Sequence, residues 1–138
     1  MIFDRLFRRK PSPQPLRGAP PVRREKSYSA QTGYVYQYYY EGCRDADREG
    51  RPGQEYVFHV SSDRKSSFSL SVFLPKAVVD GWQQRHGRAL NSTEQYAAVK
   101  LTLFRSFDER ADLGAATAEV EVDAGGIEEH LATLGIAD

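Results

Sequence analysis

Residues 68–107 read FSLSVFLPKAVVDGWQQRHGRALNSTEQYAAVKLTLFRSF, and this stretch decides the fold. Its start alternates between apolar side chains and serine, which predicts a strand over about 67–74, because strand side chains point to opposite faces in turn. Pro75 cannot donate a ladder hydrogen bond, and its fixed φ suits the first turn of a helix. We therefore expect a helix over about 75–86, ended by Gly87 in the left-handed conformation.

A second helix is expected over about 92–108. Asn91 or Ser92 can cap its start, and Gln95 stands three residues after Ser92, as a capping box requires. The spacing of its apolar residues indicates one buried face, made of Tyr96, Ala97, Val99, Leu103, Phe104 and Phe107.

Two further strands precede this stretch. Residues 34–41 read YVYQYYYE and residues 55–61 read EYVFHVS, and both alternate with a period of two. A charged loop over residues 42–54 is expected to join them, and a polar turn leads into the strand at 67–74. The chain is therefore predicted to be an α+β protein, with an antiparallel sheet of three or more strands packed on one face by the two helices.

The C-terminal part adds a short strand and a short helix to this prediction. Valine alternates with glutamate over residues 118–122, and Asp123 is placed to cap a helix around 126–134. Residues 108–138 hold nine Asp/Glu against one Lys/Arg. We expect a single domain over residues 27–138 with an acidic C-terminal segment.

Residues 1–26 are predicted to form a disordered, basic, proline-rich tail. They hold five prolines and eight Lys/Arg against two Asp/Glu, and such a segment cannot bury enough apolar surface to offset chain entropy. Residues 1–10 mix apolar and basic side chains, so peripheral contact with an anionic membrane is one hypothesis for them. We favour an unstructured start, because so short a helix is marginal alone.

The composition also limits compartment and chemistry. No apolar run approaches the roughly 20 residues that span a bilayer, and the start lacks the apolar region of a secretory signal, so we expect a cytoplasmic protein. Cys43 is the single cysteine, and the three histidines lack ligand-type spacing. Signatures of phosphate loops, dinucleotide sites and zinc proteases are absent from the sequence. We predict no cofactor, no metal site and no identifiable catalytic residue.

Two sets of side chains on the predicted sheet are candidates for binding. The first is the tyrosine row of Tyr34, Tyr36, Tyr38 and Tyr40, which could stack nucleic-acid bases or, as we favour, pack against the helices. The second is the polar face that the expected register brings together: Gln37, Tyr39, His59, Ser69 and Ser71. A merely solvated face is the favoured alternative, since antiparallel sheets commonly have one.

Lys100 is out of place on the second helix. It falls between Tyr96 and Phe104, inside the apolar arc. A desolvated lysine has a lowered pKa and can become a nucleophile or base. The favoured alternative is a stem that lies along the core while the ammonium group reaches water.

The order of strand, proline-started helix, glycine and capped helix is similar to that of ribbon-helix-helix DNA binders, in which a paired strand reads the major groove. That similarity implies Ser69 and Ser71 as base readers. Against it, two earlier strands offer this strand partners within the chain, and it lacks the Arg, Lys, Asn or Gln that usually read bases.

For function we predict a small, non-catalytic binding or adaptor protein that engages a macromolecule, in the first place a protein. Nucleic-acid binding, driven by the tail or by the ribbon-like strand, is the second hypothesis. An enzyme of unknown class is the third. A homo-oligomer is compatible with each of them.

Overall fold

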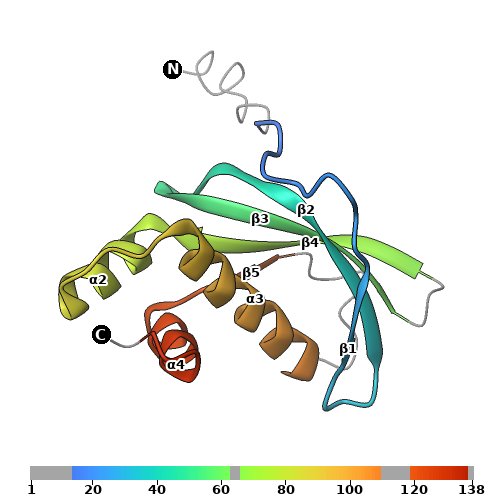
Figure 1. Ribbon diagram of the computed structural model, residues 1–138. Helices are drawn as coiled ribbons and strands as arrows, with labels where there is room; N and C mark the ends of the chain where they lie inside the picture. Colours follow the sequence, from blue (N-terminus) through green and yellow to red (C-terminus); the bar gives the residue numbers. More distant parts are fainter. Residues whose placement is uncertain (1–13, 63–65, 110–118, 137–138) are drawn as a thin grey trace.

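The computed structural model describes residues 14–62, 66–109 and 119–136. In this part of the chain, five strands form one sheet in the order β1-β2-β3-β4-β5, and three helices lie on one side of it (Figure 1). The elements are β1 (Lys26–Ser29), β2 (Val35–Arg48), β3 (Arg51–Ser62), β4 (Ser66–Pro75), α2 (Lys76–His86), α3 (Ser92–Glu109), β5 (Glu119–Glu121) and α4 (Ala124–Thr133). The predicted α+β class is confirmed.

The edge strand β5 makes the sheet mixed. It pairs in parallel with residues 71–73 of β4, whereas the other neighbouring strands pair antiparallel. A parallel neighbour needs a crossover connection, and α2 and α3 lie in that connection. The expected short C-terminal strand and helix are confirmed, and the carboxylate of Asp123 caps α4 by accepting from the backbone N–H of Gly126.

The hairpin of β2 and β3 is longer than the sequence indicates. The prediction of a charged loop over residues 42–54 is wrong, because both strands continue until Glu49 and Gly50 form the turn. These two residues have φ of 56° and 81°, as a two-residue hairpin turn requires. Oppositely charged side chains in this segment pair across the two strands, for example Arg44 with Glu55. Because such pairs neutralise the charges within the sheet, the charged residues can continue the strands.

The helix ends follow local rules with two differences from the prediction. The first is that Pro75 ends β4 and is the extended N-cap of α2, so it is not part of the first helical turn. Gly87 ends α2 at φ 66°, as expected. At the start of α3, the backbone N–H of Glu94 donates to Asn91 Oδ1 at 2.8 Å, and the N–H of Asn91 donates to Glu94 Oε1 at 3.1 Å. The capping box is therefore formed by these two residues and not by Ser92 and Gln95, because Asn91 precedes the first helical residue.

The core lies between the sheet and α3, and it includes much of the tyrosine row. Tyr36 and Tyr38 are 1% and 5% exposed, and the Tyr36 ring stacks on Phe107 with centroids 4.3 Å apart. Tyr34 precedes β2 and is 44% exposed. The two buried rings are covered by a helix, so they have no face on which a base could stack.

Residues 14–25 lie along β2, ahead of β1 (Figure 1). Arg17 forms an isolated antiparallel bridge to Cys43 of β2, and β1 begins at Lys26. This half of the predicted tail thus contacts the sheet, whereas residues 1–13, with the predicted membrane-contacting segment, lie outside the described residues. Among the helices described here, none is long and apolar enough to cross a membrane.

Candidate functional site

The predicted polar face exists as a row across three strands. Tyr39 is opposite His59 in the register, and His59 is opposite Ser69. The rings of Tyr39 and His59 stack with their centroids 4.8 Å apart. Gln37 is only 5% exposed, and Ser71 hydrogen-bonds a buried carboxylate of β3. Of the five predicted residues, Tyr39, His59 and Ser69 therefore form the row that is open to a partner.

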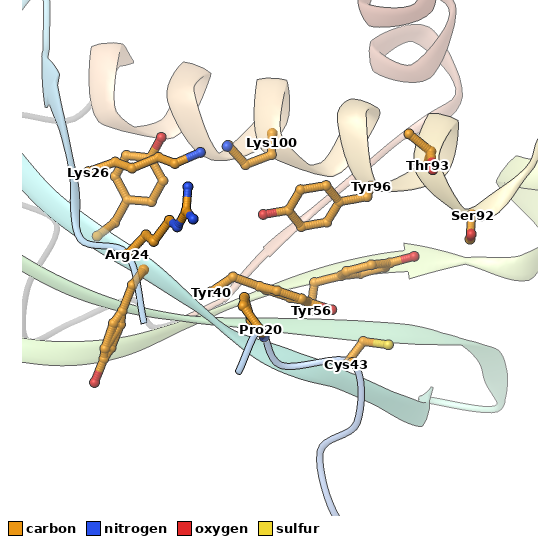
Figure 2. A pocket seen from close by; sticks show the side chains of 13 residues that line it. Pro20, Arg24, Lys26, Tyr40, Cys43, Tyr56, Ser92, Thr93, Tyr96 and Lys100 are labelled. Atoms are coloured by element: carbon orange, nitrogen blue, oxygen red, sulfur yellow. The ribbon is translucent and has the colours of Figure 1, made fainter. Parts of the chain in front are cut away.

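A different feature brings Lys100 together with residues far from it in sequence. A cavity of about 490 Å³ lies between β2, α3 and the chain ahead of β1 (Figure 2). Its lining combines tyrosine rings with cationic side chains, and we call it the tyrosine–cation cavity. It is lined by Gly18, Pro20, Arg24, Lys26, Tyr38, Tyr39, Tyr40, Cys43, Tyr56, Ser92, Thr93, Tyr96 and Lys100.

The wall on the N-terminal side is an arch, residues 18–25. At one foot of this arch Arg17 is opposite Cys43, and at the other Lys26 is opposite Tyr38. Between these two paired positions, the chain runs nine residues on the side of the arch, from Arg17 to Lys26, but only five residues in β2, from Tyr38 to Cys43. Because the arch is longer than the strand segment that it faces, it must bow away from the edge of β2, and it borders the cavity there.

A glycine in β2 allows the first foot of the arch to approach. Gly42 has φ 126°, and a Cβ at this position would lie 2.8 Å from the carbonyl oxygen of Arg17. The Arg17 side chain also donates to Gln54 Oε1 at 3.0 Å. Further along, the Arg23 guanidinium lies 5.1 Å from the centre of the Tyr39 ring. Backbone and side-chain contacts together hold the arch against the sheet.

Lys100 projects from α3 into this space. Its Nζ lies 5.4 Å, 5.6 Å and 5.5 Å from the ring centres of Tyr38, Tyr96 and Phe104. Burial lowers the pKa of Lys100, and the nearby charge of Lys26 lowers it further. The prediction that this lysine sits among aromatic rings is confirmed, and its ammonium group faces the cavity.

Cationic side chains converge on one side of the cavity. Figure 2 shows the amine ends of Lys26 and Lys100 pointing toward one another, and Arg24 lines the same cavity. These three groups come from the arch, from β1 and from α3. Like charges that approach in this way repel, so the arrangement is unfavourable unless an anion lies between them.

Ion pairing separates these cations from the others. The structure describes twelve Lys/Arg side chains, and eight of them pair with a carboxylate: Arg17, Arg44, Arg48, Arg51, Lys76, Arg85, Arg88 and Arg105. Within the described residues, the four without a carboxylate partner are Arg23, Arg24, Lys26 and Lys100. Three of them line the cavity, and Arg23 lies over Tyr39, which lines it too. The unpaired positive charge of the described chain is gathered at this one site.

Two other cavities of similar size differ in this respect. One, of about 530 Å³ between α3, β5 and α4, contains Arg105, which pairs with Glu129. The other, of about 490 Å³ at the start of α2, contains Lys76, which pairs with Asp80. Since their cations are already neutralised, neither has the excess charge of the tyrosine–cation cavity.

Three tyrosines of the cavity, Tyr40, Tyr56 and Tyr96, are neutral hydrogen-bonding groups. Burial raises the pKa of Tyr56 and of Tyr96 to about 12, and it raises the pKa of Tyr40 as well. The ring centres of Tyr40 and Tyr96 lie 4.9 Å apart at an angle of 60°. These rings pack against one another, so they form a wall with hydroxyl groups and leave no parallel slot between them.

Sequence reasoning singled out Lys100, Tyr39 and, in the tyrosine row, Tyr38 and Tyr40, but it missed the cations that accompany Lys100. Lys100 stood out because it interrupts an apolar helix face. Arg24 and Lys26 were assigned to a tail or its border, and their nearness to Lys100 depends on how the arch folds back. The available signal was the segment RREK at residues 23–26, which holds three cations and Glu25 and precedes the aromatic strand at residues 34–41.

No protein-family model, curated protein or solved structure matches this chain. We therefore infer its function from the site itself. In the described residues, no three His, Cys, Asp or Glu side chains are grouped closely enough to bind a metal ion.

Proposed function

We propose that this protein is a non-catalytic binding protein that engages an acidic segment of a protein partner through the tyrosine–cation cavity. One observation carries the proposal: Arg24, Lys26 and Lys100 line one cavity, and no described carboxylate neutralises them. A partner's carboxylates supply the missing charge, and the tyrosine wall supplies apolar contact area and hydroxyl donors.

The same geometry favours a protein partner over nucleic acid. Phosphates along a strand need cations spaced along a groove, whereas three of the four unpaired cations here line a single cavity. The tyrosine rings already contact one another, which removes a slot for a base. In the ribbon-helix-helix hypothesis the strand holding Ser69 and Ser71 is paired with a second copy, but β4 pairs along its length with β3, and its residues 71–73 also pair with β5.

Calorimetric titration with a synthetic glutamate-rich peptide tests the proposal. We expect binding that weakens as salt is raised, and a loss of about tenfold or more in affinity for Lys100→Met. Lys76→Met is the matched control, because Lys76 is an exposed lysine on α2 that pairs with Asp80 outside the site. Its affinity should equal that of the wild type.

Two results count against the proposal. The first is a peptide affinity that both lysine variants reduce equally, since this would indicate nonspecific attraction. The second is tight, salt-sensitive binding of a single-stranded oligonucleotide together with no binding of the peptide, which would favour the nucleic-acid hypothesis.

A further inference from the structure

The three cationic ends in the cavity carry more positive charge than one carboxylate can neutralise. Lys26, Lys100 and Arg24 contribute three formal charges to the lining of one cavity (Figure 2). A carboxylate brings one negative charge, whereas a phosphate monoester brings about 1.5 to 2 at pH 7 and three acceptor oxygens. We propose that the group recognised at this site is a phosphate monoester on a side chain of the partner protein, an inference that rests on the proposed function.

The donors of the site match the acceptors of a phosphate. The Arg24 guanidinium is a planar fork that can donate two parallel hydrogen bonds to phosphate oxygens, and each ammonium group donates as a point charge. In Figure 2 the hydroxyl of Tyr96 points toward the same side of the cavity as these cations. Because the pKa of Tyr96 is raised to about 12, this hydroxyl keeps its proton at neutral pH and can donate it to an anion.

The rest of the cavity suits the body that carries the phosphate. Tyr40, Tyr56 and Tyr96 form an aromatic wall beside the cations. A volume of about 490 Å³ exceeds what a phosphate alone fills, and it leaves room for an aromatic ring or a short side chain. An aromatic phosphate ester would therefore place its charge on the cations and its ring against the tyrosines.

A protein side chain fits better than a nucleotide as the source of this group. A base stacks flat on an exposed aromatic face, but the Tyr40 and Tyr96 rings are tilted by 60° and pack against one another. A side chain needs only the wall and the cations.

The test is a calorimetric comparison of three small probes with the full chain at pH 7.5: phenyl phosphate, phenyl sulfate and benzoate. All three carry the same ring, but the phosphate alone is largely a dianion at this pH. We expect phenyl phosphate to bind at least about tenfold more tightly than the other two, and its affinity to fall below pH 6 as the second phosphate proton returns. Lys100→Met and Lys26→Met should each lower this affinity about tenfold, and Lys76→Met should leave it unchanged.

A second set of titrations identifies the source of the phosphate. It uses a tyrosine-phosphorylated peptide, its unphosphorylated form, and adenosine monophosphate. The phosphopeptide is expected to bind most tightly. Tighter binding of the nucleotide would overturn the assignment to a protein side chain.

The outcomes separate this inference from the proposed function. Equal affinity for phenyl phosphate, phenyl sulfate and benzoate overturns the phosphate inference. The proposed function still stands in that case if the glutamate-rich peptide binds and Lys100→Met weakens its binding. Binding of phenyl phosphate together with no binding of any peptide overturns the protein partner and keeps the phosphate site. Failure of every probe overturns both.

Discussion

Two of the regions in which arginines or lysines lie over aromatic rings differ in how the positive charge is neutralised. At the far end of the β2–β3 hairpin, Arg48 and Arg51 lie 5.3 Å and 5.9 Å from the centre of the Phe73 ring. Both have carboxylate partners, Arg48 in Glu55 and Arg51 in Glu121. In the tyrosine–cation cavity, Lys100 lies over three rings with no described carboxylate beside it.

This difference indicates what each region does. At the end of the hairpin, each of these arginines pairs with a carboxylate, and the ion pairs connect neighbouring strands. Glu55 of β3 pairs with two arginines of β2, and Glu121 connects β5 to the hairpin. Where cations converge without acids, folding has brought like charges together, which opposes stability. Such an arrangement is favourable only when a ligand supplies the opposite charge, so we associate the first region with the fold and the second with binding.

The largest expected effect comes from breaking the paired region at Glu55. This residue is 8% exposed, and Arg44 and Arg48 both donate to it, at 2.6 Å and 2.9 Å. Glu55→Gln removes the charge that both guanidiniums share, and we expect a loss of about 2 kcal/mol in the free energy of unfolding, measured by urea denaturation at pH 7. Ligand affinity at the cavity should stay unchanged.

The pH dependence of the same variant gives a control. Burial by itself would raise the pKa of Glu55, but hydrogen bonds from Arg44, Ser71 and Arg48 outweigh it, so the pKa lies below its ordinary value of 4.5. The stabilisation is therefore present above that value and is lost as pH falls through the lowered pKa. The gap between wild type and Glu55→Gln should narrow in acid, and a constant gap would contradict the assignment.

An intermediate effect of opposite sign is expected at Lys100. The pKa of Lys100 is lowered by burial and then by Lys26, which means that folding disfavours its charged form. Lys100→Met keeps an apolar stem beside the rings, and we expect about 1 kcal/mol more stability at pH 7 together with weaker ligand binding. This opposition between stability and affinity is what a site built for a ligand predicts.

The sign of the pH effect follows from the lowered pKa of Lys100. The penalty is complete below the lowered pKa and disappears as pH rises toward the ordinary value of 10.5. Urea denaturation at pH 7 and pH 10 should therefore show the advantage of Lys100→Met shrinking. A variant less stable than wild type at pH 7 would mean that contacts with the rings outweigh the repulsion.

The smallest effect is expected at Glu121. Arg51 donates to both of its carboxylate oxygens, at 2.9 Å and 2.8 Å, but the two side chains are 50% and 40% exposed. Solvent screens such a pair, so Glu121→Gln should cost about 0.5 kcal/mol or less in unfolding free energy. High salt should remove most of the difference, and an effect as large as that of Glu55→Gln would contradict the distinction between buried and exposed pairs.

Much of the fold could be predicted from sequence, and the candidate site only in part. The strand ending at Pro75 and the helices around Gly87 and Asn91 are local patterns, and the structure has them where expected. Residues 42–54 were predicted as a loop because isolated charges resemble solvated loops. Their pairing across the hairpin depends on contacts between residues distant in sequence, which periodicity cannot reveal.

The sequence by itself determined the strand alternation, the helical spacing and the helix ends. It also showed that Lys100 interrupts the apolar face of its helix. Alternation and helical spacing act over neighbouring residues, so Lys100 could be recognised as a charge on an apolar face. Only the tertiary structure decided which charges are neutralised. Arg24 and Lys26 line the same cavity as Lys100 because the arch folds back along β2, which brings together residues more than 70 positions apart in the chain. Electrostatic energy depends on distance in space. A cation with a carboxylate beside it therefore stabilises the fold, whereas a cation without such a neighbour is available to bind an anionic ligand.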